Sequence, residues 1–84
     1  MKLPMYLIFG ARPVKFVATD DGGLDIRAFD WETGDFVRAL EYGPRFFKFE
    51  PEMDEVTEDE FNRRVAALRR DLGGRTAGRE RERK

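Results

Sequence analysis

Residues 24–42 read LDIRAFDWETGDFVRALEY, and this stretch predicts a β-hairpin. Apolar side chains at short spacing indicate two strands, over 24–31 and 36–42, with the polar segment ETGD at 32–35 between them. We interpret the join as a three-residue loop, in which a type I turn is closed by Gly34 as a left-handed bulge. The hairpin is therefore expected to form part of an antiparallel sheet.

The loop length sets the register of this hairpin. The predicted cross-strand pairs are Ile26 with Leu40, Phe29 with Val37, and Asp30 with Phe36. Because side chains alternate between the faces of a sheet, Phe29, Trp31 and Val37 should share one face. A single helix covers only one face. We therefore expect the second apolar face to pack against residues 46–49, a second copy or a different protein.

Two more strands are predicted before the hairpin. Met5–Phe9 is apolar throughout and too short for a helix, which is typical of a buried strand. Residues 14–19 form the next strand, and the DDGG turn at 20–23 makes it antiparallel to the hairpin. Residues 46–49 are expected to add a short fifth strand, which Pro51 would end.

The helix start is the clearest local signal in the chain. Thr57 and Glu60 have the spacing of a capping box, and Val56 and Phe61 have that of a hydrophobic staple. The apolar stripe at helical spacing consists of Phe61, Val65, Leu68 and Leu72. A helix end is predicted at Gly73-Gly74, and residues 75–84, which contain no large apolar residue, are expected to be disordered.

The fold class that follows is α+β. We expect an antiparallel meander of four to five short strands, with one C-terminal helix packed on one face and a disordered C-terminal tail. Residues 1–74 would form a single small domain and residues 75–84 a charged tail. The sequential strand order is preferred because neighbours in sequence usually pair in space.

The composition narrows the possible chemistry. The 84 residues include no serine, cysteine, histidine or glutamine, which removes the common nucleophiles, the neutral-pH base and the soft metal ligands. We therefore expect no enzyme activity, no cofactor and no metal site. The longest apolar run is only five residues, and no signal peptide is evident, so we expect a cytoplasmic protein without a membrane segment.

Acidic residues gather at 50–60, where seven acids occur without a base. Carboxylates could hold Mg²⁺ or Ca²⁺, and a metal-dependent hydrolase that uses only Asp and Glu is the hypothesis with least support. Residues 57–60 are explained by the helix start, and the remaining acids are expected on a solvated linker. A surface acidic patch is the favoured interpretation.

The favoured function is a small non-enzymatic protein-interaction module, either a homodimer or a subunit or regulator of a larger assembly. Phe29, Trp31 and Val37 are the interface candidates, because aromatic side chains are the usual anchors of interfaces. The alternative is nonspecific nucleic-acid association through the basic tail. Its candidate residues are Arg79, Arg81, Arg83 and Lys84.

Overall fold

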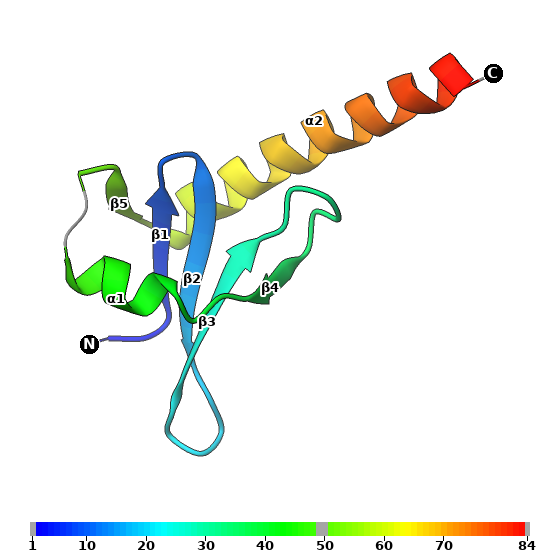
Figure 1. Cartoon of the computed structure of the whole chain (residues 1–84). Coiled ribbons are helices and arrows are strands. Elements are labelled where there is room, and N and C mark those ends of the chain that lie inside the picture. Colours follow the sequence, from blue (N-terminus) through cyan, green and yellow to red (C-terminus); the bar gives the residue numbers. More distant parts are fainter. Residues whose placement is uncertain (1, 49–50, 84) are drawn as a thin grey trace.

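The computed structural model describes residues 2–48 and 51–83, with side chains described as far as residue 73. The elements, in chain order, are β1 (Met5–Phe9), β2 (Arg12–Ala18), β3 (Leu24–Phe29), β4 (Phe36–Arg38), α1 (Tyr42–Phe47), β5 (Met53–Val56) and α2 (Glu58–Arg83). Figure 1 shows a twisted sheet with α2 crossing it and projecting beyond it. The predicted α+β fold class is confirmed.

The sheet has five strands in the order β4-β3-β2-β1-β5, and every neighbouring pair is antiparallel. The first four strands form the expected meander. The fifth strand lies beside β1, at the opposite edge from β4, because the chain passes along the sheet as α1 before it returns. The two edges of the sheet are therefore β4 and β5.

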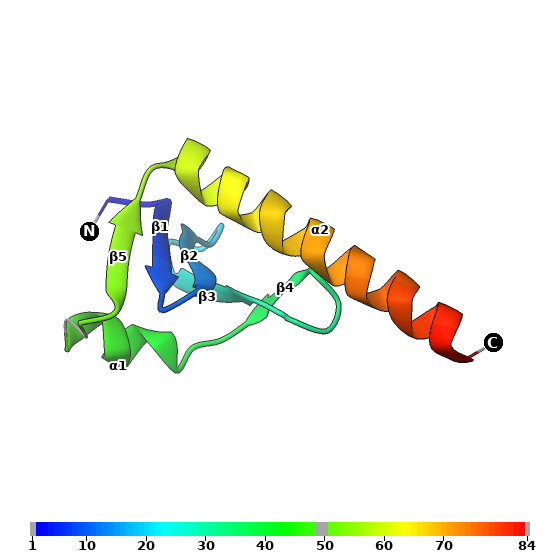
Figure 2. The same cartoon turned by 90° about the horizontal axis from the view of Figure 1, so that it is seen from above.

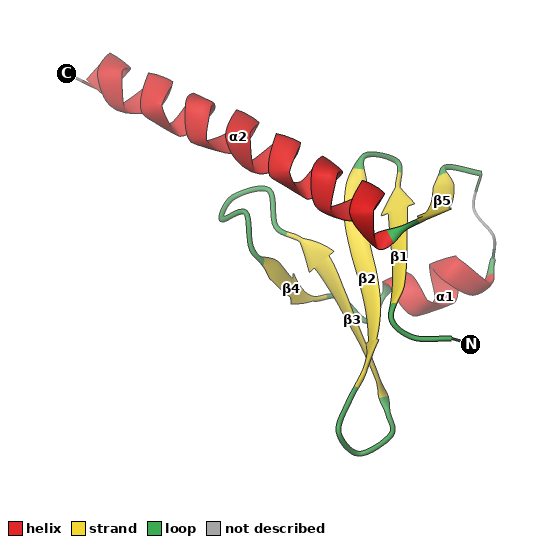
Figure 3. Cartoon of the chain, turned by 180° about the vertical axis from the view of Figure 1, so that it is seen from behind, coloured by secondary structure: helices red, strands yellow, loops and turns green. Residues whose placement is uncertain are grey.

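Each face of the sheet is covered by one helix, as Figures 2 and 3 show. The buried cluster on the α1 face consists of Leu7, Phe9, Val14, Phe16, Ile26, Ala28, Ala39 and Tyr42. The buried cluster on the α2 face consists of Ile8, Phe29, Phe61 and Val65, with Tyr6, Phe36, Val56 and Leu68 packed against it. The domain is a three-layer sandwich in which the sheet separates two apolar clusters.

The start of α2 follows its sequence signals. The Thr57 hydroxyl accepts a hydrogen bond from the Glu60 backbone N–H at 3.2 Å, as an N-cap residue does. Val56 and Phe61 join the same apolar cluster, in agreement with the predicted staple. The Glu60 carboxylate differs from the prediction, because it accepts hydrogen bonds from Arg63 and Arg64. The capping box is therefore completed only on the Thr57 side.

The hairpin register differs by one residue from the prediction. Phe29 lies opposite Phe36 and Ala28 lies opposite Val37, because four residues, 31–34, separate the hydrogen-bonded pair of Asp30 and Asp35. A shift of one residue moves a side chain to the other face. Val37 therefore leaves the face of Phe29, and the two strands are shorter than predicted, ending at Phe29 and Arg38.

The predicted strand over 46–49 is wrong where the structure describes it, because residues 42–47 form α1. Pro44 is tolerated in the first turn of a helix, where its missing N–H has no partner to lose. Helical spacing then places Tyr42 against Phe9, with ring centroids 4.9 Å apart, and Phe46 against Phe16, at 5.3 Å. The folding back of this segment covers the second sheet face. Phe49 lies outside the described residues.

The helix α2 continues past the predicted end at Gly73-Gly74 to Arg83. Glycine inside a helix costs about 1 kcal/mol relative to alanine, so it weakens a helix without necessarily ending it. Beyond Gly73 the helix leaves the body of the domain, with no sheet beneath it (Figures 1 and 2). An unsupported helical end is only marginally stable in water, so the disorder of residues 75–84 stays a prediction.

Candidate interaction surface

The loop between β3 and β4 is closed by its own polar groups. The Asp30 carboxylate accepts hydrogen bonds from the Glu32 backbone N–H at 3.0 Å and from the Thr33 hydroxyl at 3.2 Å. The Gly34 N–H donates to the Asp30 carbonyl at 2.8 Å, and Gly34 has a φ of 78°. The left-handed glycine is thus as predicted. These bonds fix the end of the hairpin.

The same loop is held against α2. Arg69 Nε donates a hydrogen bond to the Gly34 carbonyl at 2.8 Å. Gly34 is buried, and a Cβ at this position would lie 3.3 Å from Leu72 Cδ2. The positive φ therefore favours glycine at this position, and a Cβ would in addition crowd the Leu72 side chain of α2.

Exposed apolar side chains gather on this hairpin. In the described part of the chain, large exposed apolar residues occur at five positions: Leu24, Trp31, Val37, Leu40 and Phe47. Four of them lie between residues 24 and 40, on β3, β4, their loop and the exit from β4. We call Leu24, Trp31, Val37 and Leu40 the hairpin edge. Trp31 and Val37 are each 40% exposed and Leu40 is 51% exposed, in contrast to the core residues around them.

A group of cationic side chains occupies the α2 side of the same edge. Cross-strand pairing places Lys15 beside Arg27, and Arg27 beside Arg38. Asp25 lies on the same face of β3 and accepts hydrogen bonds from Arg27 Nε at 2.8 Å and from Arg38 Nε at 3.3 Å. Lys15 Nζ lies 4.6 Å from the ring centroid of Phe36. We call Lys15, Arg27 and Arg38 the cationic patch.

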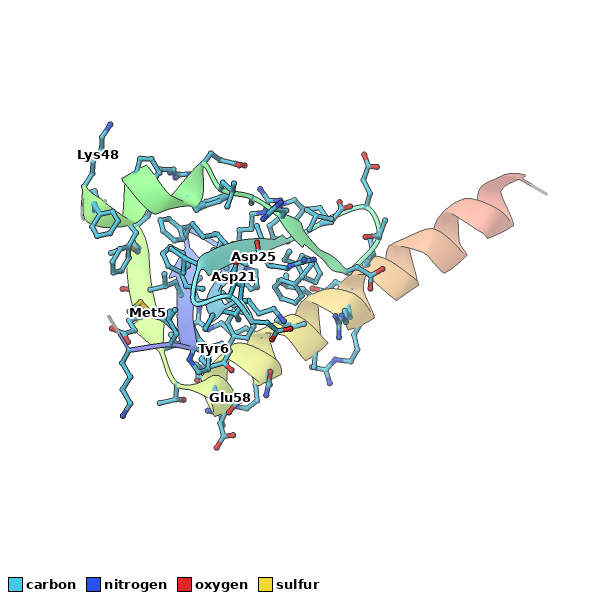
Figure 4. All side chains as sticks on the ribbon, turned by 90° about the horizontal axis from the view of Figure 1, so that it is seen from below. Met5, Tyr6, Asp21, Asp25, Lys48 and Glu58 are labelled. Carbon is cyan, nitrogen blue, oxygen red and sulfur yellow. The ribbon has the colours of Figure 1, made fainter. Side chains whose placement is uncertain are left out.

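The Asp25 carboxylate organises this patch. Its side chain is only 11% exposed, whereas those of Arg27 and Arg38 are 45% and 66% exposed. The hydrogen bond from Arg27 lowers the pKa of Asp25 from its ordinary value, against the opposing effect of burial, and the positive charges of both arginines add to the lowering. Figure 4 shows Asp25 among the side chains of the sheet. The carboxylate is therefore held in its charged form.

The opposite edge of the sheet is acidic. Its exposed acids are Glu52, Asp54, Glu55, Glu58 and Asp59, on β5 and its two flanks. We call this set the acidic edge. Tyr6 Oη donates a hydrogen bond to Glu58 at 3.2 Å, at the start of α2 (Figure 4), and burial followed by the Glu58 charge raises the pKa of Tyr6. The expectation of a solvated linker here is wrong for Met53–Val56, which forms an edge strand whose acids point to solvent.

The three interface residues predicted from sequence do not share one face. Phe29 is only 1% exposed and belongs to the α2-side core. Trp31 packs edge-on against Phe29, with ring centroids 5.4 Å apart, and keeps part of its surface exposed. Val37 lies on the other side of β4. The structure therefore brings Trp31 and Val37 to the same edge of the sheet but not to the same face.

The sequence reasoning missed Leu24, Leu40 and the cationic patch. The signal was the alternation of Asp25 and Arg27 on β3, which places two charges on one side of a strand. Only the correct register shows that Arg38 joins them. Of the nucleic-acid candidates, Arg79, Arg81 and Arg83 lie on the part of α2 whose side chains are not described, and Lys84 lies outside the described residues.

Among the described residues, no three carboxylates come close enough together to hold a metal ion. No helix in that part of the chain is both long enough and apolar enough to cross a membrane. Comparisons of the chain with protein-family models, with curated proteins and with solved structures found no match. The interpretation of the surface therefore starts from its own geometry.

Proposed function

We propose that this chain is a cytoplasmic, non-enzymatic protein-interaction module that binds its partner through the hairpin edge. The observation that carries the proposal is that four of the five large exposed apolar residues in the described part of the chain belong to the β3–β4 hairpin and its exit. Both faces of the sheet are already covered by the chain's own helices. Apart from Phe47 at the end of α1, the large apolar side chains left exposed in the described residues lie on the β3–β4 hairpin and its exit.

The hairpin edge has the features of an interface core. Apolar side chains with a polar rim are typical of binding patches, and a tryptophan is among the commonest anchors. The short edge strand β4 also has an outer side that no other strand of the described sheet covers, and such edges accept strands from partners. The loop fixed by Asp30 and Arg69 presents this surface with little loss of flexibility on binding.

The composition supports a binding role over catalysis. A chain without serine, cysteine or histidine has only carboxylates, amines, threonine and tyrosine for chemistry. The one buried carboxylate described, Asp25, is paired with two arginines and is not poised to exchange a proton near neutral pH.

The proposal is tested by affinity capture from a lysate of the source organism, after nuclease treatment, with three baits. The baits are the wild-type chain, the double variant Val37→Asp/Leu40→Asp, and Ala66→Asp as the control. Ala66 is exposed on α2, away from the hairpin edge, so the control adds a charge at a distance from the proposed surface. We expect the wild type and the control to retain the same protein and the double variant to lose it.

Retention of the same protein by all three baits would contradict the proposed surface. Circular dichroism of the double variant must match that of the wild type, so that a loss of capture does not report unfolding. Trp31→Ala provides a second variant that adds no charge, and it should weaken capture without unfolding the domain. Recovery that disappears with nuclease would favour the nucleic-acid alternative instead.

A further inference from the structure

The two edges of the sheet differ in charge. At the β4 edge, the strand ends at Arg38, with Arg27 and Lys15 behind it on the neighbouring strands, and the acids Asp35 and Glu41 lie just outside the two ends of the strand. At the β5 edge, the exposed acids belong to the acidic edge, and the base paired with them is Arg45, 3.9 Å from Glu52. The two edges are on opposite sides of the domain (Figure 1), so they cannot meet within one molecule.

We infer that the chain binds a second copy of itself head to tail, with the cationic patch beside β4 of one copy against the acidic edge beside β5 of the next. This inference rests on the proposed function, because it names the partner of the β4 side of the molecule. It adds the acidic edge as the second half of the same contact. Each copy then carries one donor surface and one acceptor surface.

The cationic patch is already arranged to receive carboxylates. Asp25 accepts hydrogen bonds from the Nε atoms of Arg27 and Arg38. The two arginine side chains are 45% and 66% exposed, so their outer Nη groups remain for a partner. Guanidinium groups bind carboxylates through paired N–H donors. The contact of Lys15 with the Phe36 ring holds a third cation nearby. The partner chemistry that fits this patch is a group of exposed carboxylates, such as those of the acidic edge.

Charge also selects the head-to-tail arrangement over a two-fold dimer. A two-fold contact places a surface against itself. A two-fold contact of the cationic patch would set its cations against the same cations of the second copy, and pairing β5 with β5 would set Asp54 and Glu55 against the same acids. Like charges placed directly opposite each other destabilise strand pairing. A contact between the cationic patch and the acidic edge instead places opposite charges together.

Strand direction and apolar residues are consistent with the same contact. Both β4 and β5 run antiparallel to β1, because three antiparallel steps separate β4 from β1 and one separates β5 from it. If a second copy is placed beside the first in the same orientation, its β5 would therefore run parallel to β4 of the first copy. The two sheets would then form one continuous sheet, with α1 of both copies on one face and α2 of both copies on the other. Phe47, which is 64% exposed at the end of α1, precedes Lys48 on the β5 side (Figure 4). It could meet the apolar residues of the hairpin edge in the next copy.

The experiment is sedimentation velocity with purified full-length chains, at concentrations up to about 1 mM because charge-driven contacts are weak. One variant, Asp54→Asn/Glu55→Gln, neutralises the two acids of the acidic edge that lie within β5. A second, Asp25→Asn/Arg27→Gln/Arg38→Gln, neutralises the two arginines of the patch together with their buried partner, so that no charge is left buried alone. Asp20→Asn/Asp71→Asn is the control, because it changes the net charge as much as the edge variant at exposed sites elsewhere.

We expect the mean mass of the wild type and the control to rise with concentration at about 20 mM salt and to return to monomer at about 0.5 M, where screening is strong. Each neutralised variant alone should associate at least tenfold more weakly. A mixture of the two should form a dimer and no larger species, since each variant contributes one intact surface. This capped dimer is the result specific to a head-to-tail contact.

The inference is overturned by a wild type that stays monomeric at low salt. It is also overturned if either variant alone associates as strongly as the wild type, or if the mixture remains monomeric while the wild type associates. The Asp54→Asn/Glu55→Gln variant is expected to fold like the wild type, since both residues are exposed. It therefore keeps the test valid even if the patch variant misfolds. The proposed function is disproved by a different result from the one that disproves this inference. A wild type without self-association whose capture of another protein still depends on Val37 and Leu40 would disprove only this inference.

Discussion

Asp25 is a carboxylate that the fold both buries and pairs with two arginines. Its folded-state pKa is lower than the ordinary value of about 3.9. The ionised form therefore stabilises the fold fully above the ordinary pKa, and this contribution is lost as the pH falls through the lower folded-state pKa. The contribution of the Asp25 ion pairs should therefore be measurable from the pH dependence of the stability of the fold.

We expect Asp25→Asn to melt at a lower temperature than the wild type at pH 7, and the difference to narrow as the pH is lowered toward about 2. The measurement is a series of thermal melts of both proteins, followed by circular dichroism, across that pH range. Asp20→Asn, in the exposed turn after β2, should melt like the wild type throughout. A melting difference that stays constant with pH would show that the ion pairs are not its cause.

At the scale of single residues, the sequence predicts those features that depend only on neighbouring residues in the chain. Gly34 is expected in the left-handed region because the turn demands it, and the structure has it there. The N-cap at Thr57 is likewise a matter of neighbouring residues. The link between Asp25 and Arg38 spans 13 positions, and only the cross-strand register brings the two together. No local pattern specifies that register well enough.

At the scale of elements, the contact between the β3–β4 loop and α2 can be tested by comparing substitutions at two glycines. Gly34 and Gly22 both have positive φ, at 78° and 84°. A Cβ at Gly34 would meet Leu72, whereas a Cβ at Gly22 has nothing within 4 Å. The pair therefore separates backbone strain from packing.

We expect Gly22→Ala to lower the free energy of unfolding by about 1 kcal/mol, from the left-handed conformation alone. Gly34→Ala should lower it by about 1 kcal/mol more, because the added methyl group crowds the packed contact with α2. Urea denaturation of the two variants and the wild type gives both values. Equal losses would mean that the loop moves away from α2 without penalty.

The elements themselves were predictable where one physical signal dominates. Met5–Phe9 and the start of α2 are as expected, because an apolar run and a cap each specify one structure. The predictions that were wrong concern segments whose residues favour more than one structure. Phe46 and its neighbours have strand-forming side chains, but the spacing of Tyr42 and Phe46 suits a helix on the sheet. The acidic residues of β5 conceal an edge strand, since its hydrogen bonds to β1 depend little on side chains.

At the scale of the whole molecule, the body of the domain and the end of α2 are distinct. The side chains of α2 that contact the apolar cluster are Phe61, Val65 and Leu68, and Leu72 lies close to Gly34. The residues that follow have no large apolar side chain. The stability of the domain should therefore depend little on residues 75–84.

We expect a chain that ends at Gly74 to melt within about 2 °C of the full chain, since 1 kcal/mol corresponds to roughly 4–8 °C in a domain of this size. Differential scanning calorimetry of the two chains measures it. A drop of more than about 5 °C would show that the removed segment packs on the domain. The same truncation should abolish any salt-dependent binding to nucleic acid, if Arg79, Arg81, Arg83 and Lys84 provide it.

The side chain of Arg12 connects the sheet to α1. Its Nε donates to the Phe29 carbonyl at 2.7 Å and its Nη1 to the Tyr42 hydroxyl at 3.0 Å. The apolar clusters above and below the sheet share no side chain, so α1 and α2 depend on the strands more than on each other. Native-state opening is expected to proceed in steps. Partial unfolding that releases α1 would expose the strands from one side while α2 keeps them assembled from the other.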